Sequence, residues 1–261
     1  MPGERDRAVG EGYYLVSNVT WAEKTKLARQ LRRRVLRADT VLDIGTGILP
    51  QTLVWAKLHI CVEPHSEYVE CLRQGIGSSP RYLIVQSQWR PFMNTLSPKS
   101  VDTVIALDFI EHLAKEEGFA FLGEAERVAR RQVIIFTPLG YFPQCYDNSG
   151  EKDRWGMSGG EWQTHRSGWV PTDFSTEWEI VACRHYHDAD QHGQVLEEPH
   201  GCFWAIKTFS QRPHDMDPIA RHTVRATTEP RLWGLTIMRR YAPLWLERLL
   251  VVGWQYKKKW T

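Results

Sequence analysis

The sequence predicts an α/β protein with a doubly wound, mostly parallel sheet of seven strands and helices on both faces. Two observations carry this prediction. Apolar strand-like segments alternate with helix-like segments between residues 40 and 136, and such alternation is typical of parallel sheets with right-handed crossovers. The first strand runs directly into a glycine loop, Gly45-Thr46-Gly47, which would let the backbone approach a ligand closely.

The predicted strands are short and mostly apolar. They cover residues 40–44, 59–62, 82–85, 101–107 and 132–136, followed by two more at 178–186 and 202–209. The strand at 101–107 is apolar along most of its length, as expected for a strand that is covered on both faces. We therefore expect helices to cover both faces of this strand.

The predicted helices separate these strands and also precede them. Thr20 and Glu23 form a capping-box pattern that predicts a helix to about residue 36. Further helices are expected over 51–57, 66–74 and 111–130. After Pro138 the periodicity stops, and residues 139–170 form a long irregular stretch, which in a compact domain is usually functional or mobile.

Three regions follow from this pattern. We expect an N-terminal helical cap at 1–36, a sheet-bearing domain at 37–210 with a lid inserted at 139–170, and a C-terminal tail at 211–261. The tail contains an apolar stretch, 241–254, which is too short to span a bilayer. It fits a helix packed on the domain or on a second subunit. Its flanking cations and tryptophans also fit peripheral membrane contact through 239–260.

Composition excludes several classes of function. Lys and Arg total 33 against 31 for Asp and Glu, a balance that gives no support to a nucleic-acid partner. The five cysteines are odd in number, widely spaced and without a C-x-x-C pair, which disfavours a disulfide framework and a structural zinc site. We expect a cytoplasmic protein without a bound metal.

Four residues that could contact a ligand fall at the predicted carboxyl ends of four strands. They are Gly45, Glu63, Gln88 and Asp108. In a doubly wound sheet, ligands bind outside the carboxyl ends of the strands. Glu63 follows Gly45 by eighteen residues, and an acidic side chain at this place can accept hydrogen bonds from both hydroxyls of a ribose. The sequence therefore predicts a ligand that contains a nucleoside.

The glycine loop distinguishes between two kinds of nucleoside ligand. A dinucleotide site usually has the pattern G-x-G-x-x-G, whereas here the loop reads Gly45-Thr46-Gly47-Ile48-Leu49-Pro50 and lacks a third glycine. The absence of this glycine disfavours a nicotinamide-dependent oxidoreductase, which we keep as an alternative that an NADH titration tests.

Four segments together resemble class I S-adenosylmethionine-dependent methyltransferases. They are Val41 to Gly47, which resembles motif I, Cys61-Val62-Glu63-Pro64, Ser100 to Leu113, and Gln132 to Pro138. The resemblance covers about residues 35–210 and implies a Rossmann-like methyltransferase fold. The segments Gly47 to Gln51, Trp155-Gly156 and Glu161 to Trp169 are similar to a bacterial subgroup of this family whose substrates are unknown.

The resemblance implies S-adenosylmethionine as the cofactor and gives its site residue by residue. Asp43 would orient the loop near the amino-acid end of the donor, and Gly45, Thr46 and Gly47 would pass its methionine portion. Glu63 would bind the ribose, and Asp108 would lie beneath the methyl-donor centre. Gln88 and Trp89 occupy the adenine position without the acidic residue often found there, so that Trp89 would stack on the base.

The acceptor is expected in the lid. His112 and His165 are the candidate general bases for a hydroxyl acceptor. Aromatic and charged side chains could hold the acceptor, namely Tyr141, Asp153, Trp155, Arg166 and Trp169. We therefore expect methyl transfer to a small molecule or a saccharide, at oxygen. The alternative is a non-catalytic module that binds S-adenosylmethionine and acts as a partner or scaffold.

Overall fold

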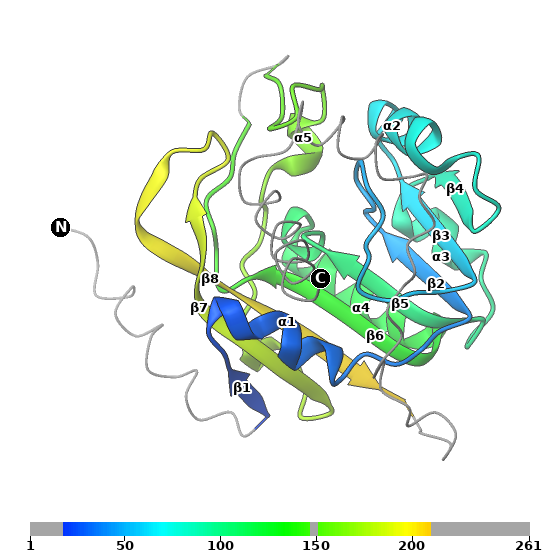
Figure 1. The fold of residues 1–261 in the computed structure, drawn as a ribbon, viewed down its shortest axis with the longest axis horizontal. Coiled ribbons are helices and arrows are strands. Elements are labelled where there is room, and N and C mark those ends of the chain that lie inside the picture. The colour runs from blue at the N-terminus through cyan, green and yellow to red at the C-terminus, as the bar shows by residue number, and fades with distance from the viewer. Residues whose placement is uncertain (1–17, 147–150, 210–261) are drawn as a thin grey trace, which may run out of the picture.

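The computed structural model describes residues 18–146 and 151–209, which form a Rossmann-like α/β fold around one eight-stranded sheet (Figure 1). The strand order is β1-β7-β8-β6-β5-β2-β3-β4. All neighbouring strands are parallel except β8, which is antiparallel to both β6 and β7. The strands are β1 (Val19–Trp21), β2 (Thr40–Ile44), β3 (Leu58–Glu63), β4 (Tyr82–Gln86), β5 (Val101–Leu107), β6 (Ala129–Pro138), β7 (Trp178–Ala189) and β8 (Val195–Thr208).

The seven predicted strands are confirmed, and β1 is an eighth that the sequence analysis assigned to a helix. Its residues are β-branched and aromatic, which favours a strand, and Val19–Trp21 pairs in parallel with β7. The helix that follows, α1 (Lys24–Arg32), begins only after Glu23. The predicted cap at Thr20 is therefore wrong, because Thr20 lies within the strand.

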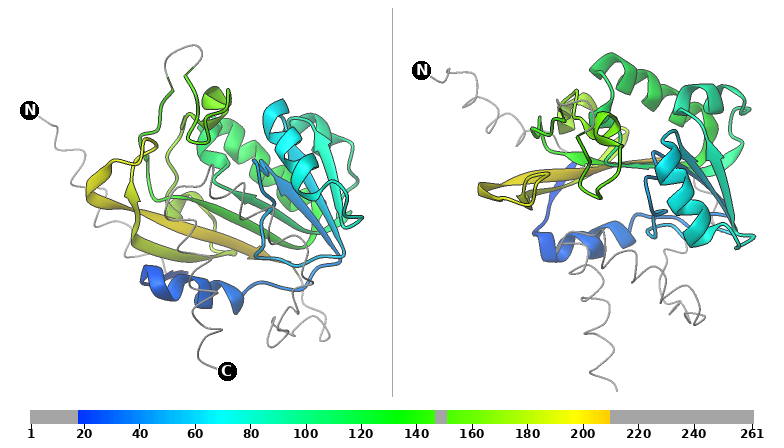
Figure 2. Two further views of the ribbon diagram at one scale, coloured as in Figure 1. Left: turned by 45° about the horizontal axis from the view of Figure 1, so that its top comes forward. Right: turned by 90° about the horizontal axis from the view of Figure 1, so that it is seen from above.

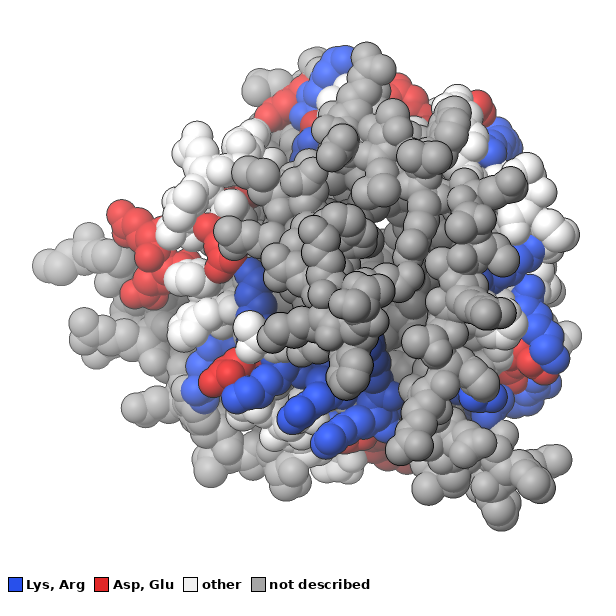
Figure 3. Space-filling view, in the orientation of Figure 1, with Lys and Arg blue, Asp and Glu red and all other residues white. Residues whose placement is uncertain are grey.

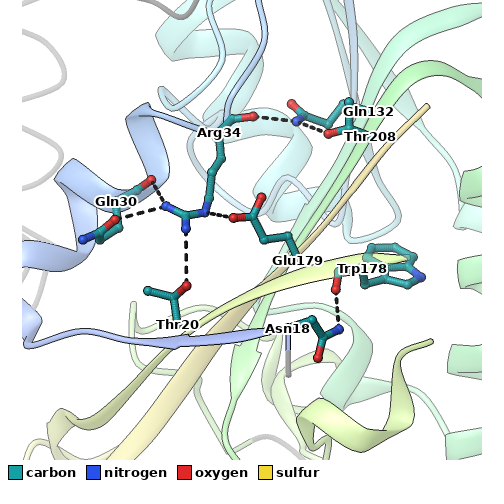
Figure 4. Close-up of polar contacts among 8 residues, drawn as sticks. All are labelled: Asn18, Thr20, Gln30, Arg34, Gln132, Trp178, Glu179 and Thr208. Carbon is teal, nitrogen blue, oxygen red and sulfur yellow. Dashed lines mark hydrogen bonds and ion pairs between the residues drawn. The ribbon is translucent and has the colours of Figure 1, made fainter. Parts of the chain in front are cut away.

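Arg34 ties α1 to the edge of the sheet (Figure 4). Its guanidinium donates to Glu179 Oε1 at 2.5 Å, to the Gln30 carbonyl oxygen at 2.9 Å and to Thr20 Oγ1 at 3.4 Å. These three partners come from β7, α1 and β1. The arginine thus holds the N-terminal segment in place, while other basic side chains of α1 stay exposed and gather on the lower part of the face in Figure 3.

The helix predicted over 51–57 does not form. Residues 45–57 are irregular, and the side-chain amide of Gln51 bonds both the N–H and the carbonyl of Val54, at 2.9 and 3.1 Å. This local turn replaces a helical start after Pro50. The glycine loop is therefore not followed by a helix N-terminus.

Helices cover both faces of the sheet and leave the carboxyl ends of the central strands open to other segments (Figure 2). On one face, Leu27 and Leu31 of α1 belong to an apolar core that also contains Ile105 and Ile134. On the other face, Phe121 and Ala125 of α4 (Lys115–Val128) belong to a second apolar core. The remaining helices are α2 (Ser66–Ile76), α3 (Trp89–Asn94) and the short α5 (Gly160–Gln163).

The helix predicted at 111–130 is divided in two. A 3-10 turn, η2 (Ile110–His112), directly follows β5, and α4 starts only at Lys115. A second turn, η3 (Pro171–Asp173), leads from the lid into β7. The predicted tail helix at 241–254 lies outside the described residues. Among the helices that the structure describes, none is long and apolar enough to cross a membrane.

Candidate functional site

The glycine loop between β2 and β3 needs both of its glycines. Gly45 has φ +66° and Gly47 has φ +64°, a left-handed conformation that side chains with a β-carbon disfavour. A β-carbon on Gly45 would also lie 2.5 Å from Cδ2 of Phe109. The ring that follows β5 thus packs directly against the loop that follows β2, and the two strand ends form one site.

Asp43 fixes the conformation of this loop through hydrogen bonds. Its Oδ2 accepts hydrogen bonds from the Gln51 N–H at 3.0 Å and from His59 Nε2 at 2.9 Å, and the side chain is buried. Thr46 Oγ1 donates to the Asp43 carbonyl at 2.9 Å. Two points of the loop, Thr46 and Gln51, are therefore fixed to Asp43 near the end of β2. The expected position of Asp43 beside the amino-acid end of a donor remains a prediction.

Glu63 lies at the end of β3 and faces the loop. Its Oε2 accepts the Gly47 N–H at 2.8 Å, and its Oε1 accepts the His65 N–H at 3.0 Å. The side chain is 4% exposed, and this burial raises its pKa to about 7. A carboxylate has about four lone-pair sites, so each oxygen can still accept a hydrogen bond from a ligand.

The adenine position contains one accessible and one buried residue. Gln88 is exposed just beyond β4, and the neighbouring Ser87 N–H donates to the Glu63 carbonyl at 3.2 Å. Trp89, in contrast, is 5% exposed, packs edge-on against Phe121 and belongs to the core. The expectation that Trp89 stacks on a base does not fit this structure, because its ring is already enclosed.

Asp108 follows β5 in a left-handed conformation, with φ +47°. Among residues other than glycine, Asp and Asn tolerate this region best. Its N–H donates to the Phe136 carbonyl at 3.0 Å, and the residue is exposed. Asp108 thus presents a carboxyl group at the sheet edge, next to the Phe109 ring that contacts the loop.

The lid connects the two sides of this edge, and Figure 1 shows α5 beside α2 above the sheet. On the α2 side, Ser158 Oγ donates to Glu67 Oε1 at 2.6 Å, and the Tyr68 hydroxyl donates to Asp153. On the β5 side, the N–H groups of Arg166 and Ser167 donate to the Glu111 carbonyl at 2.7 and 3.0 Å. The segment therefore bridges the carboxyl ends of β3 and β5.

Two of the five predicted acceptor residues are occupied by structural contacts. Trp169 is fully buried and donates to the Ile110 carbonyl at 3.1 Å. Asp153 is buried and accepts the N–H groups of Trp155 and Met157 at 2.8 and 2.9 Å. We correct their expected role, because neither side chain is open to an acceptor without a rearrangement of the lid.

The other three predicted acceptor residues remain accessible. Tyr141 is 54% exposed, and its hydroxyl donates to the His165 carbonyl at 3.3 Å. Arg166 is exposed, and Trp155 is half-buried with its ring edge-on to Tyr68. These side chains lie on the lid that covers the sheet edge, so their role in holding an acceptor remains a prediction.

His112 of η2 and His165 of the lid lie side by side, with ring centroids 4.9 Å apart. Burial lowers their pKa values to about 3 and about 4, so both rings are neutral at pH 7. A general base works best when its pKa lies near the operating pH. The two predicted bases are therefore placed together as one pair, but they are weak bases.

Sequence reasoning gave no role to Glu111, which lies beside this pair. The side chain is 2% exposed, and its Oε2 accepts the Thr137 hydroxyl of β6 at 3.0 Å. Its place was visible in the sequence as the residue between the end of a strand and His112. Only the fold of residue 165 back onto η2 reveals that Glu111 belongs to a site.

Comparison with known proteins returned solved structures only. No protein family model and no curated protein matches the chain. The chain is similar to a structure described as a SAM-dependent methyltransferase from Archaeoglobus fulgidus, with 15% identity, a TM-score of 0.43 and coverage of 71% of this chain and 92% of the other. It is also similar to a putative methyltransferase from Bacillus halodurans, with 14% identity, a TM-score of 0.47 and coverage of 70% of this chain and 98% of the other. A third similar structure is phosphoethanolamine N-methyltransferase 1 from Haemonchus contortus, with 13% identity, a TM-score of 0.41 and coverage of 72% of this chain and 44% of the other.

Proposed function

We propose that the protein binds S-adenosylmethionine at the carboxyl ends of β2, β3 and β5 and transfers its methyl group to a small-molecule or saccharide acceptor, at oxygen. The observation that carries this proposal is the Glu63 carboxylate. It is enclosed at the end of β3, bonded to the Gly47 N–H of the glycine loop, and retains lone pairs for ribose hydroxyls.

The loop supports a methyl donor over a dinucleotide. Dinucleotide sites bind a pyrophosphate at the N-terminus of the helix that follows the glycine loop. Here residues 45–57 contain no helix, and the Gly47 N–H donates to Glu63. A negatively charged pyrophosphate would have to lie close to this carboxylate. S-adenosylmethionine has no phosphate, and its sulfonium is positively charged.

Methyl transfer places modest demands on the protein. The sulfonium already activates the methyl group, so the protein mainly has to hold donor and acceptor in line. The lid segment between Asp153 and Ser167 is bonded to α2 and to η2, and it would enclose the reacting groups between these two anchors. Tyr141, Trp155 and Arg166 are the accessible side chains that we assign to the acceptor.

Calorimetric titration tests the donor site. We expect the wild-type protein to bind S-adenosylmethionine and S-adenosylhomocysteine but not NADH. Because hydrogen bonds to a charged group contribute about 1.5–3 kcal/mol, Glu63→Ala should weaken binding roughly 10- to 100-fold. Glu70→Ala is the matched control, since this exposed glutamate of α2 bonds only to Gln74 among the described residues, and it should bind as the wild type does.

Four results would count against the proposal. The folded protein could bind no S-adenosylmethionine, or Glu63→Ala could bind it as tightly as the wild type does. Binding of NADH instead would support the oxidoreductase alternative. If the donor binds but no methyl group reaches any acceptor in a broad screen of hydroxylated small molecules and saccharides, the non-catalytic module is the better description.

A further inference from the structure

Three side chains with metal-ligating groups converge between η2 and the lid. Glu111, His112 and His165 each offer one ligand atom, and these atoms all lie within 4.8 Å of one another. The first two residues follow β5 directly, whereas His165 is brought back by the lid. The group is therefore a product of the tertiary fold and not of a local sequence motif.

The hydrogen bonds of both histidines leave the same nitrogen available. His112 Nδ1 lies 3.1 Å from the Thr164 carbonyl oxygen, and His165 Nδ1 lies 2.6 Å from the Phe142 carbonyl oxygen. A carbonyl can only accept, so Nδ1 of each neutral ring carries the proton and Nε2 keeps its lone pair. The His112 ring also lies near the Asp108 carbonyl, so the proton on Nδ1 is the assignment that the metal site requires there. This is the arrangement that orients metal-binding histidines in proteins, where the second nitrogen donates to a backbone carbonyl or carboxylate.

Glu111 supplies an independent sign of a missing ligand. One carboxylate oxygen, Oε2, accepts the Thr137 hydroxyl at 3.0 Å. The other, Oε1, is buried and has no hydrogen-bond partner among the residues that the structure describes. A buried carboxylate oxygen without a donor is costly, and a cation at this point would remove the cost.

We propose that His112, His165 and Glu111 bind one divalent transition-metal ion through the two Nε2 atoms and Oε1 of the glutamate. Two imidazoles and one carboxylate on one side of an ion are a set that first-row transition metals accept. Bonds from such an ion to nitrogen or oxygen are about 2.0–2.2 Å long, so ligand atoms within 4.8 Å need only small side-chain adjustments.

A second group of candidate ligands, Asp43, His59 and Cys61, also contains a buried atom without a partner, His59 Nδ1, but two of its ligand atoms are already bonded to each other. His59 Nε2 and Asp43 Oδ2 already bond to each other at 2.9 Å. Cys61 is fully buried in the middle of β3. This group therefore serves as the internal control.

The ion would have a chemical use that rests on the methyl transfer proposed above. His112 is only half-buried and Asp108 beside it is exposed, so the ion can keep open positions toward the sheet edge. A hydroxyl bound to a divalent ion releases its proton to water more readily than a free one. The metal would thus activate an acceptor oxygen in the proposed methyl transfer.

The test uses the full chain, stripped with a chelator and titrated calorimetrically with Zn²⁺ and separately with Mn²⁺, in the absence of S-adenosylmethionine. We expect one ion per chain for at least one of the two metals. Changes at the ligands, His112→Ala and His165→Ala, should weaken binding by at least about 100-fold. The controls His192→Ala, at an exposed histidine outside the site, and Cys61→Ala should leave the affinity unchanged.

A third ligand variant and two further measurements protect the test against misfolding. Glu111→Gln removes the charge but keeps the shape of the side chain, and circular dichroism verifies that each variant is folded. In wild-type protein with ¹⁵N-labelled histidine, Zn²⁺ should shift two Nε2 resonances and leave their Nδ1 resonances as protonated donors.

Three results would overturn the metal site. They are no binding of either ion by the wild type, loss of binding in Cys61→Ala, and binding that survives all three ligand changes. Titration of the metal-free protein with S-adenosylmethionine separates a failure here from a failure of the donor site.

Discussion

At Glu63, the proposed ligand-binding role and a cost in stability involve the same side chain. Burial raises its pKa from 4.5 to about 7, so the folded protein holds this proton more tightly than the unfolded chain does. The stabilisation from the bound proton is complete below about pH 4.5 and is lost as the pH rises through about 7. The difference amounts to roughly 3 kcal/mol, from about 1.4 kcal/mol per pKa unit.

This cost predicts that the difference in unfolding free energy between the wild type and Glu63→Gln depends on pH. Chemical denaturation of ligand-free wild type and Glu63→Gln should be compared at pH 5 and pH 8. The buried histidines titrate in the opposite direction, because their pKa values are lowered, but they are common to both proteins and cancel in the difference. Relative to Glu63→Gln, the wild type should lose about 2–3 kcal/mol of unfolding free energy between pH 5 and pH 8. A gap that does not change with pH would contradict an enclosed carboxyl group.

Single residues also mark the limit of prediction from sequence. Gly45, Glu63 and Asp108 were predicted at strand ends, and the structure brings them to one edge of the sheet, because parallel strands place their carboxyl ends together. Trp89 and Trp169 were assigned to ligands and are in the core. Tryptophan is both a stacking and a core residue, and only tertiary packing distinguishes the two uses.

At the scale of elements, α4 provides the surface on which the lid is anchored. A β-carbon on Gly118 would collide with the Trp169 ring, whereas nothing lies within 4 Å of such an atom on Gly123, one and a half turns along the same helix. The missing side chain at Gly118 thus lets the buried tryptophan of the lid pack onto the helix.

The two glycines of α4 give a matched pair of variants. Gly118→Ala should lower the unfolding free energy by about 1–3 kcal/mol through overpacking. Gly123→Ala should raise it by about 0.5–1 kcal/mol, since alanine favours a helix over glycine. Thermal and urea unfolding of both variants would measure this contrast. If Gly118→Ala were as stable as Gly123→Ala, the packing of Trp169 on α4 would be wrong.

Elements with clear apolar patterns were predictable, and those decided by distant contacts were not. The seven longer strands are confirmed. Six of them bury a run of apolar residues, and β4, the last strand of the sheet, is apolar but only partly covered. The three-residue β1 forms only because it pairs with β7. The two segments are far apart in the sequence: Asn18, which donates to the Trp178 carbonyl, lies 160 positions before it. The helix predicted at 51–57 is wrong because Gln51 bonds locally to Val54. Such side-chain bonds compete with helix formation and leave no periodic signal.

For the molecule as a whole, the carboxyl ends of the strands and the lid bring distant parts of the chain together at one site. The loop after β2, Glu63 after β3 and Asp108 after β5 lie on one side, and the lid reaches across from α2 to η2. The proposed donor and the proposed metal ion would be neighbours there, separated by the turn from Asp108 to His112. The arrangement accounts for a lid that is anchored at both ends.

A crystal structure of the protein with S-adenosylhomocysteine tests this account most directly. We expect the ribose hydroxyls within hydrogen-bond distance of the two Glu63 oxygens, the amino-acid portion along Gly45 to Gly47, and the sulfur facing Asp108 beneath the lid. Density for the ligand at another surface, or a Glu63 carboxylate that makes no contact with the ribose, would contradict the account.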